Sequence, residues 1–495
     1  MRVLRGGQER IRSPAELRSG RLIARRENAG WAFHRYALCA SGHRRVIQIN
    51  GRNKRAGYSE IEKTPVHGAF DRTPATQAAE ELMVHDTVAG RTRDGFATVR
   101  TLIRRIVDSV ARGQKYHLKV VFSDSSTYDS TRLGDPDITI IFRNRAAEWR
   151  MVLGGVFEFL ESYFDGDVDI VGEQGLRRLV NLGYRKPFGR FEHPLTFVKR
   201  RFLEWQQNNR NFAQAKRNAT FHYGLPTEFF RLVLGDTYGY SEGFWSADTQ
   251  TLDEAQHNNF DLICRKLQLG PGDKLIEVGP GWGYMSMLAA EKYGANVTSY
   301  GLVGSQNDGM RMLMKSRNFR GKLTLVEKDH RELANEPASY DRFVSIGVHE
   351  HAGRDCNEQW IRSIAIGLRP GGIGLISATF NMKKCPTNYC TIKHIFPGGY
   401  IPSLAETLIL MEKHGLNVRA IENHSYHYHR SVEQWLKNLE THWERIHALD
   451  PLRFNEHFRR SWRFYLGGAA ETFEAAREII NCYHITFVKG HFERA

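Results

Sequence analysis

The sequence predicts an α/β protein, in which a smaller α+β domain precedes a Rossmann-like domain built on a doubly wound, mostly parallel sheet. Between about residues 257 and 381, short apolar runs alternate with helical patterns, as a parallel sheet with crossover helices requires. The first of these runs ends in a glycine-rich turn, Glu277-Val-Gly-Pro-Gly-Trp-Gly283. A length of 495 residues is too great for one ordinary domain and suits two or three.

The smaller domain is expected to contain two helices and two strands. Apolar residues recur at helical spacing over 96–110, which predicts the first helix. Strands are expected over 119–122 and 138–142, with a Gly-Asp-Pro turn at 134–136 before the second. A further helix is expected over 152–164. No catalytic constellation is evident in this region.

The larger domain alternates strands with helices. Strands are expected over five apolar runs, at 274–278, 295–300, 323–326, 342–346 and 373–380. Helices are expected at 285–293, from about 305 onward, and at 358–368, where Pro370-Gly371-Gly372 ends the last one. After residue 400 we expect further helices and a closing strand at 483–488.

Positive charge is concentrated at the N-terminus. The formal net charge is +15, and residues 1–56 hold 14 basic residues but three acidic ones. An apolar core typical of a secretory signal is lacking there, so we expect a disordered extension; a transit peptide or a native start at Met83 is the alternative. The expected parts are the basic extension at 1–82, a small α+β domain at 83–184, a connector at 185–218 and the large domain at 219–495.

Composition indicates the cellular location of the protein and excludes some classes of partner. Six cysteines in this length make no disulfide framework, which predicts a reducing, cytoplasmic location. No stretch approaches eighteen uninterrupted apolar residues, so a transmembrane helix is not expected. Outside 1–56 the charges nearly balance, and we predict no nucleic-acid partner. The run His424-x-x-His427-x-His429 does not match a common zinc spacing, so we predict no metal.

Basic and aromatic residues alternate through the connector at 185–218. Such a segment suits the surface of an anionic membrane, which predicts a peripheral protein at the inner face of the membrane. The alternative is a solvated helix that packs by its aromatic face. The sequence alone leaves both interpretations open.

The glycine-rich turn has the spacing Gly-x-Gly-x-Gly, with Glu277 two residues before Gly279. This form is typical of S-adenosylmethionine (SAM) sites, whereas dinucleotide sites use Gly-x-Gly-x-x-Gly. Glycines let the backbone turn sharply and approach a ligand closely. We therefore expect Glu277, Gly279, Gly281 and Gly283 to form part of a SAM site, the alternative being a tight turn without a ligand.

Two later strands end in further candidate SAM contacts. The second strand ends in Ser299-Tyr300-Gly301 and lacks the acidic residue that usually binds ribose hydroxyls. Gln306 is the nearest side chain that can both donate and accept hydrogen bonds. Asp329 and His330 follow the third strand, where a contact with adenine is usual.

From about residue 218 to 490 the chain resembles the cyclopropane-fatty-acyl-phospholipid synthases and the related mycolic acid cyclopropane synthases. The pieces that match are His222-Tyr223-Gly, Tyr240-Ser241-Glu242-Gly-Phe-Trp245, Thr251-Leu-Asp-Glu-Ala-Gln256, the run Glu277 to Gly283, Val344 to Gly353 and His394-Ile-Phe-Pro-Gly-Gly399. The region 96–180 is similar to the smaller N-terminal domain of the longer synthases.

This resemblance implies a Rossmann-like SAM-dependent methyltransferase. An unsaturated acyl chain of a membrane phospholipid would attack the methyl group of SAM, and proton loss from the new methyl would close a cyclopropane. The family binds bicarbonate as the base through a Cys, a Glu, a His and a Tyr; by motif position the Glu is Glu350 and the Tyr is Tyr428. Further SAM contacts carried over by motif are Tyr240, Ser241, Gly279, Gly281, Leu302, Gln306 and His330.

The sequence departs from the family where bicarbonate would bind. The family Cys is Glu242 here, and the family His aligns with Ser377. A bicarbonate ion beside both Glu242 and Glu350 in a dry pocket would be unfavourable, so we doubt that it binds. We expect the Glu242 carboxylate to stabilise the cation and accept the proton, and the two glutamates to share a proton. Two smaller departures are Gly224 in place of Asp and Gly301 in place of Thr.

Several outcomes stay open at this level. A shifted base can remove a proton from a ring-neighbour carbon, which would give a methyl-branched alkene instead of a cyclopropane. Loss of the Cys and His is also compatible with an inactive lipid-binding homologue. Another substrate, such as a small amine or RNA, is supported by the basic extension alone. A homodimer is compatible with the sequence.

Overall fold

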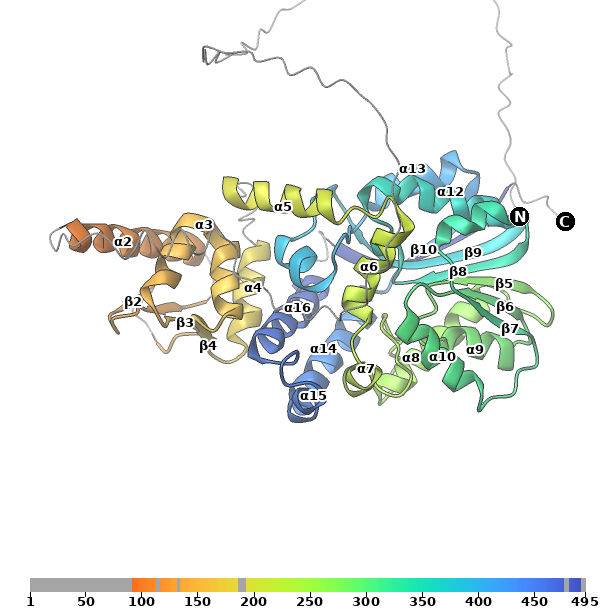
Figure 1. The fold of residues 1–495 in the computed structure, drawn as a ribbon, viewed down its shortest axis with the longest axis horizontal. Helices are drawn as coiled ribbons and strands as arrows, with labels where there is room; N and C mark the ends of the chain where they lie inside the picture. The colour runs from red at the N-terminus through yellow and green to blue at the C-terminus, as the bar shows by residue number, and fades with distance from the viewer. Residues whose placement is uncertain (1–90, 113–115, 131–133, 186–192, 476–479, 491–495) are drawn as a thin grey trace, which may run out of the picture. The chain divides into compact units, whose positions relative to one another are not determined.

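The computed structural model describes residues 91–112, 116–130, 134–185, 193–475 and 480–490 (Figure 1). These residues belong to one unit, which extends from Asp86 to Ala495. The basic extension expected over 1–82 and the alternative start at Met83 lie outside the described residues.

A four-stranded sheet with the order β2-β1-β3-β4 forms the smaller domain. Its elements are α2 (Arg91–Ala111), β1 (Leu118–Val121), β2 (Thr127–Asp129), β3 (Ile138–Phe142), α3 (Arg145–Phe164), β4 (Val168–Val171) and α4 (Gly175–Arg185). β1 and β3 are parallel, and the two outer pairs are antiparallel. The two expected strands and both expected helices are present, whereas β2 and β4 are too short to stand out in the sequence.

The helix α3 begins earlier than the expected start at 152. Its cap is Asn144, whose side chain accepts a hydrogen bond of 2.9 Å from the backbone N–H of Ala147. Within the helix, Gly155 has a φ of 70°, which kinks the axis. The kink interrupts the helical spacing of apolar residues, so the first half of α3 is not recognisable from periodicity.

Much of the connector is helical. α5 (Pro194–Gln206) lies in it, α6 (Phe212–Tyr223) begins in it, and α7 (Thr227–Leu234) and α8 (Leu252–Lys266) follow. Thr251 and Glu254 form a capping box at the start of α8, which satisfies backbone N–H groups there. Among the described residues, no helix has the length and apolar character that crossing a bilayer requires.

The larger domain contains a seven-stranded sheet with the order β10-β11-β9-β8-β5-β6-β7. Its strands are β5 (Lys274–Val278), β6 (Asn296–Tyr300), β7 (Leu323–Val326), β8 (Tyr340–Ile346), β9 (Leu368–Asn381), β10 (Leu416–Asn423) and β11 (Ile480–Lys489). The five neighbouring strands β9, β8, β5, β6 and β7 are parallel to one another. β11 is antiparallel to both of its neighbours, β9 and β10. This is the doubly wound, Rossmann-like fold that the sequence predicts.

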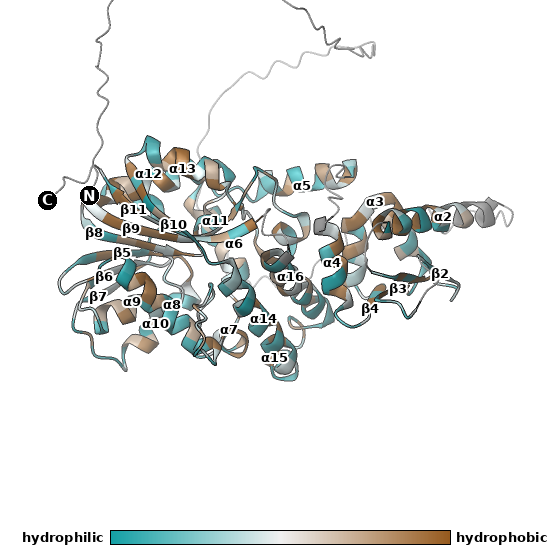
Figure 2. Cartoon of the chain, turned by 180° about the vertical axis from the view of Figure 1, so that it is seen from behind, coloured by the Kyte–Doolittle hydropathy of each residue, from teal (hydrophilic) through white to brown (hydrophobic). Residues whose placement is uncertain are grey.

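Helices cover both faces of this sheet. α12 (Asn357–Gly367) and α13 (Leu404–Lys413) lie on one face, and α8, α9 (Tyr284–Glu291) and α10 (Gly304–Met314) lie on the other (Figures 1 and 2). Each interface is a separate apolar cluster, with Trp360 in one and Met285 in the other. The middle residues of the central strands β5, β8 and β9 are buried, as expected for strands covered on both faces.

One boundary differs from the expectation at 370–372. The Pro-Gly-Gly run was expected to form a turn before the strand, but β9 already begins at Leu368. Leu368 pairs with Tyr340 of β8, and a register shift follows before the regular pairing resumes at Ile373. The strand therefore accommodates the irregular residues as a bulge.

A layer of helices lies beside the sheet and packs through aromatic side chains. It contains α7, α14 (Ser425–Thr441), α15 (Trp443–Leu449) and α16 (Glu456–Ala475). Phe229, Trp435 and Trp462 are buried in its core. α16 also packs against α4, so this layer connects the two domains.

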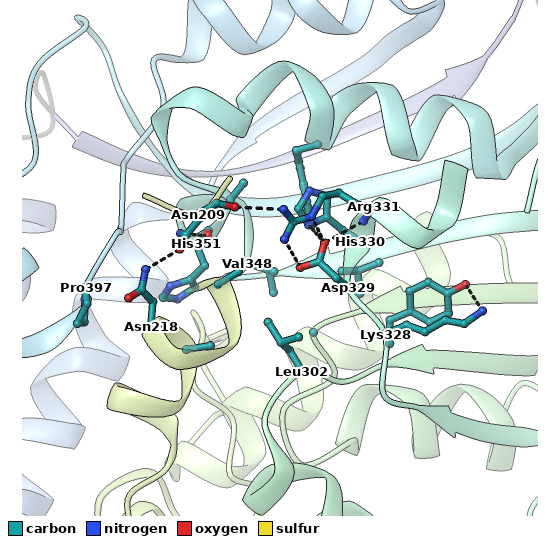
Figure 3. Close-up of a pocket in the computed structure, with 17 residues that line it drawn as sticks. Asn209, Asn218, Leu302, Lys328, Asp329, His330, Arg331, Val348, His351 and Pro397 are labelled. Atoms are coloured by element: carbon teal, nitrogen blue, oxygen red, sulfur yellow. Dashed lines mark hydrogen bonds and ion pairs between the residues drawn. The ribbon is translucent and has the colours of Figure 1, made fainter. Parts of the chain in front are cut away.

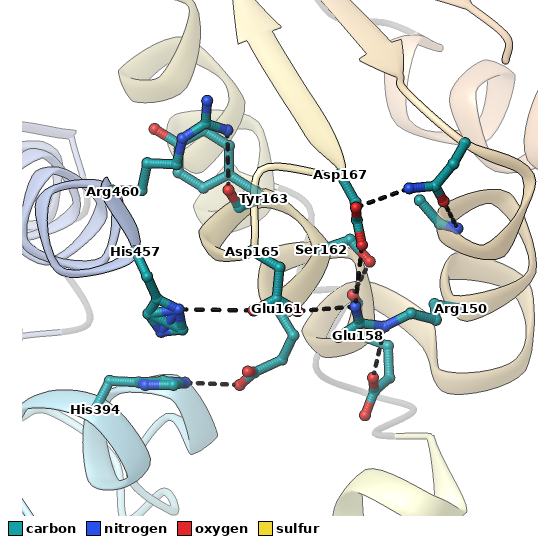
Figure 4. A network of polar contacts seen from close by, with 12 residues as sticks. Arg150, Glu158, Glu161, Ser162, Tyr163, Asp165, Asp167, His394, His457 and Arg460 are labelled. Atoms are coloured by element: carbon teal, nitrogen blue, oxygen red, sulfur yellow. Dashed lines mark hydrogen bonds and ion pairs between the residues drawn. The ribbon is translucent and has the colours of Figure 1, made fainter. Parts of the chain in front are cut away.

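A polar network joins the smaller domain to the larger one (Figure 4). The buried Glu161 of α3 accepts hydrogen bonds of 2.8 Å from both His394 and Lys393, which belong to one short π-helical turn. Burial opposes ionisation, but the hydrogen bonds and charges of His394 and Lys393 lower the pKa of Glu161 to about 2. Arg460 of α16 adds an ion pair of 2.9 Å with Asp169 of β4.

Candidate active site

The glycine-rich turn follows β5 and leads into α9. Gly279, Gly281 and Gly283 have φ values of 76°, 57° and 85°, in the left-handed region that favours glycine. A Cβ at Gly279 would overlap Val348, and one at Gly283 would lie 2.6 Å from the Met310 side chain. The turn therefore needs glycine both for its conformation and for the close approach of neighbouring elements.

A pocket lies at the carboxyl edge of the sheet, beside this turn (Figure 3). Its walls come from the residues that follow β5, β6, β7 and β8, and from α6 and the segment before it. Of the predicted SAM residues, it is lined by Gly279, Leu302, Asp329 and His330. This is where doubly wound domains bind their ligands.

His330 presents an unpaired nitrogen in this pocket. Both oxygens of Asp329 are held by Arg331, at 2.7 and 2.8 Å, and His330 Nδ1 lies 3.0 Å from the same carboxylate. Burial opposes ionisation of Asp329, but Arg331 and His330 keep its pKa well below the usual range. Since a carboxylate accepts, Nδ1 of His330 donates to Asp329; Nε2 is buried without a partner among the described residues. In the neutral imidazole, this nitrogen is an acceptor that fits the amino group of adenine.

Other predicted SAM residues support the pocket from outside its walls. The buried Glu277 accepts a hydrogen bond from the Ser286 hydroxyl at the start of α9. Burial raises the pKa of Glu277 to about 7. Gln306 begins α10 beside the turn, and its Nε2 would lie 3.9 Å from a Cβ at Gly281. At Gly301, a Cβ would overlap the amide of the Asn307 side chain, which would have to move to admit a larger residue.

Tyr240 and Ser241 precede Glu242; Ser241 is buried and Tyr240 is partly buried. The Tyr240 hydroxyl donates a hydrogen bond of 3.2 Å to the Tyr465 hydroxyl, and Ser241 Oγ lies 3.4 Å from the Gln256 side chain. His222 stacks against Tyr240 at 5.6 Å between ring centroids. The result is an aromatic wall next to the carboxylates described below.

Glu242 is 2% exposed and has partners from several distant segments. Its Oε1 accepts hydrogen bonds of 2.6 Å from both Ser377 Oγ and His484 Nε2, and Asn259 Nδ2 lies 3.2 Å away. Burial opposes ionisation, but His484 above all, with His424 and Ser377, lowers the pKa of Glu242 to about 2. The structure thus brings the predicted Glu242 and Ser377 together and adds His484, which the sequence does not single out.

Glu350 has different partners. Its Oε1 accepts hydrogen bonds of 2.6 Å from both the backbone N–H and the hydroxyl of Thr379, while Oε2 is buried without a partner among the described residues. Burial raises the pKa of Glu350, and the charge of Glu242 adds to the effect. No hydrogen bond between the two glutamates is among those of the described residues, so the expected sharing of a proton stays a prediction.

Tyr428 lies on α14 and is packed between Trp435 and Phe473. Burial raises its pKa well above the ordinary value, and the Tyr465 and Glu350 side chains raise it further. The phenol is therefore neutral and can act as a hydrogen-bond donor. Among the described residues, no group of three or more His, Cys, Asp and Glu side chains is arranged to hold a metal ion.

Sequence comparisons relate this chain to lipid-modifying enzymes. The model of the mycolic acid cyclopropane synthetase family matches residues 210–485, more than half of the chain. The probable fatty acid methyltransferase of Pseudomonas putida is 31% identical over 278 residues, covering 55% of this chain and 69% of that protein. Cyclopropane mycolic acid synthase 1 of Mycobacterium tuberculosis is 32% identical over 272 residues, which cover 52% of this chain and 92% of that protein. The cyclopropane-fatty-acyl-phospholipid synthase of Escherichia coli is 27% identical over 367 residues, which cover 72% of this chain and 87% of that protein.

Solved structures agree with this relation. A mycolic acid cyclopropane synthase complexed with SAH and CTAB superposes with a TM-score of 0.51 and 28% identity, covering 55% of this chain and 98% of that one. Coclaurine N-methyltransferase bound to N-methylheliamine and SAH has a TM-score of 0.55 at 21% identity, and the match covers 68% of this chain and 99% of that one. At this identity the likeness shows a shared fold alone. Fold and pocket together define a SAM-dependent methyltransferase. Within that class, the chain belongs to the mycolic acid cyclopropane synthetase family.

Proposed function

We propose that this enzyme adds the methyl carbon of SAM to the double bond of an unsaturated acyl chain in a membrane phospholipid. The names of its relatives support an acyl substrate, since they include a fatty acid methyltransferase and a cyclopropane-fatty-acyl-phospholipid synthase. The buried aromatic wall around Tyr240 and His222 suits an apolar chain. SAM, when bound, supplies an electrophilic methyl group.

The residues around the pocket have separate proposed roles towards SAM. The backbone of Gly279, Gly281 and Gly283 allows its close approach, and His330 Nε2 accepts from adenine. Glu277 supports the turn from below through Ser286. Tyr240, Ser241, Leu302 and Gln306 complete the surroundings of the co-substrate, and Asp329 orients His330.

One observation supports Glu242 as the base: it is a buried carboxylate, fixed by Ser377 and His484, at the motif position where the family has a bicarbonate ligand. Its charge makes a second anion unfavourable at that place. Because its pKa is low, Glu242 is ionised at neutral pH and can stabilise a neighbouring cation. Glu350 and Tyr428 then contribute hydrogen bonds.

The proposed reaction balances as follows. The alkene carbon forms a bond to the methyl carbon while the S–CH3 bond breaks, leaving SAH and a cation at the other alkene carbon. Glu242 takes one proton. If the proton comes from the new methyl group, the freed electron pair closes a cyclopropane; if it comes from a neighbouring chain carbon, the pair forms a C=C bond beside a methyl branch. The fixed position of Glu242 favours one of these two products over a mixture.

We also propose that α5 contacts the membrane. Its exposed Leu195, Val198, Phe202 and Trp205 recur at helical spacing and form one apolar stripe. Lys199 and Arg201 flank this stripe and are partly exposed. An apolar stripe with flanking cations is the composition that inserts into the headgroup region of an anionic bilayer.

The test is to express the protein in a bacterium fed methionine labelled in its methyl group, and to analyse the fatty acids by mass spectrometry. We expect a labelled gain of one CH2 in phospholipid acyl chains, located as a ring or as a branch. Glu242→Gln should lower turnover by about 10²–10⁴-fold while SAM binding stays near normal, because the amide cannot accept the proton.

Two outcomes would contradict the proposal. Absence of label in lipid would favour the inactive lipid-binding homologue or a different substrate. Unimpaired turnover of Glu242→Gln would remove Glu242 from the reaction, whatever the product is.

A further inference from the structure

A buried histidine lies behind Glu242 on the last strand. His484 is fully buried in the middle of β11, where it pairs in register with Ser377 of β9. Its Nε2 lies 2.6 Å from Glu242 Oε1, and its Nδ1 lies 2.9 Å from Lys266 Nζ at the end of α8. Three segments far apart in the sequence thus meet in one line of contacts, Lys266 to His484 to Glu242.

The direction of each hydrogen bond follows from the chemistry of the groups. An ammonium group donates and has no lone pair, so Nδ1 of His484 must accept from Lys266. A neutral imidazole then holds its proton on Nε2, which donates to the carboxylate of Glu242. On its outer side, Lys266 pairs with the half-exposed Glu422 at 2.7 Å, which holds the ammonium in place.

A second imidazole reinforces this arrangement. The ring of His424 stacks on His484 with a centroid distance of 3.7 Å, and its Nε2 lies 3.3 Å from Lys266 Nζ. Burial above all lowers the pKa of His424 to about 3, so it is neutral and can accept from the same ammonium. Lys266 therefore contacts both imidazoles, and their stacking prevents His484 from rotating.

We propose that Lys266 and His484 form a positioning relay that holds Glu242 as a carboxylate with Oε1 occupied and Oε2 available for a proton. Within the described residues, the only hydrogen-bond partner of Oε2 is the Cys482 thiol, a weak donor at 3.7 Å. The inference rests on the proposed role of Glu242 as the base. It makes Lys266 and His484 positioning residues, which act through Glu242 without touching substrate.

The relay predicts a change in the pH dependence of the reaction. The charged and titratable groups around Glu242 are His484 and Cys482 on β11, Lys266 on α8, Glu350 on α11 (His349–Ala352), Tyr428 and His427 on α14, and His424 before α14. Of these, His484 contributes most to keeping Glu242 ionised. Without it, burial and the nearby Glu350 would favour the protonated form, so the base would be active only at higher pH.

The experiment compares pH–rate profiles of the full-length enzyme and its variants, with SAM binding as the control for folding. His484→Leu should lower kcat by about 10–100-fold and move the acid limb of the profile to higher pH. In His484→Gln, the side-chain amide can still donate to Glu242, and most of the activity should return. Lys266→Met should move the acid limb in the same direction, while Lys413→Met, which removes an equivalent ion pair with Glu358 on the far face, should not.

The outcomes separate this inference from the proposed function. If Glu242→Gln is fully active, the role of Glu242 fails and the relay fails with it. If Glu242→Gln is inactive but Lys266→Met and His484→Leu keep the wild-type profile, the relay is overturned and the base remains. If His484→Leu does not bind SAM, the decision falls to Lys266→Met and His484→Gln; an unshifted acid limb in Lys266→Met overturns the relay.

Discussion

Three glutamates show how neighbouring groups determine whether a carboxyl group removed from water is ionised. The side chain of Glu242 is buried and Glu350 is partly buried. The pKa of Glu242 is low because of His484 above all, whereas desolvation leaves the pKa of Glu350 raised because its donors are the Thr379 hydroxyl and backbone N–H. The pKa of Glu277 is raised like that of Glu350, since the hydrogen-bond donor to Glu277 is the Ser286 hydroxyl. The ionisation of these carboxyl groups therefore depends on which donors face them: the His484 imidazole with Lys266 behind it, or hydroxyl and backbone N–H groups alone.

Glu277 gives a prediction about stability and pH. Its pKa is raised from 4.5 in the unfolded chain to about 7 in the folded protein, because of burial. Such a group stabilises the fold less as pH rises through this window, by about 3 kcal/mol in total. Glu277→Gln should remove that loss, because the amide keeps an acceptor for Ser286 and does not ionise.

The measurement is the free energy of unfolding in urea between pH 4.5 and 8, compared for the wild type and Glu277→Gln. The variant should gain stability relative to the wild type as pH rises. Parallel curves across the window would show that Glu277 does not change its proton affinity on folding.

The elements of the fold were predictable to different degrees. β5 and β7 match their expected bounds, because short apolar runs between polar turns are clear in sequence. The start of α3 was missed because the kink at Gly155 breaks the apolar period, and the start of β9 was missed because Pro370 and two glycines are typical of a turn. In both cases tertiary packing overrides a local signal.

The helix α5 carries a prediction at this scale. Phe202→Ser with Trp205→Ser should weaken binding to vesicles of unsaturated anionic phospholipid by at least about tenfold, because each aromatic side chain contributes on the order of 1.5 kcal/mol when buried. Trp205 is 74% exposed, so its replacement should leave SAM binding unchanged. Vesicle sedimentation measures the effect.

A matched control is Leu452→Ser, since Leu452 is 90% exposed but lies on a turn outside α5. It should bind vesicles like the wild type. Equal binding by the double variant and the wild type would assign the membrane contact, if there is one, to another surface.

The candidate site combines residues that motifs identify with one residue, His484, that only the folded chain brings there. Motif order placed Glu242, Ser377, Glu350 and Tyr428 in one expected site, and the structure shows direct contact between Glu242 and Ser377. His484 could not be anticipated, because its contact depends on the register between β9 and β11, more than a hundred residues apart. Its one signal in sequence is a histidine in the middle of a mostly apolar closing strand.

The smaller domain is attached to the larger one close to these elements. Glu161 of α3 pairs with His394 and Lys393, in the π-helical turn that leads to Phe396 (Figure 4). Phe396 in turn packs against His222 and His351, beside the candidate site. The interface between the domains and the aromatic wall of the site therefore share one continuous set of contacts.

The most direct test of the central claim is the rate of the purified enzyme in buffer freed of carbon dioxide and bicarbonate. If the Glu242 carboxylate replaces bicarbonate, the wild-type rate is the same with and without added bicarbonate. The double variant Glu242→Cys with Ser377→His restores the side chains of the typical family member and should become dependent on bicarbonate. A wild-type rate that falls on depletion and returns with bicarbonate would contradict the account.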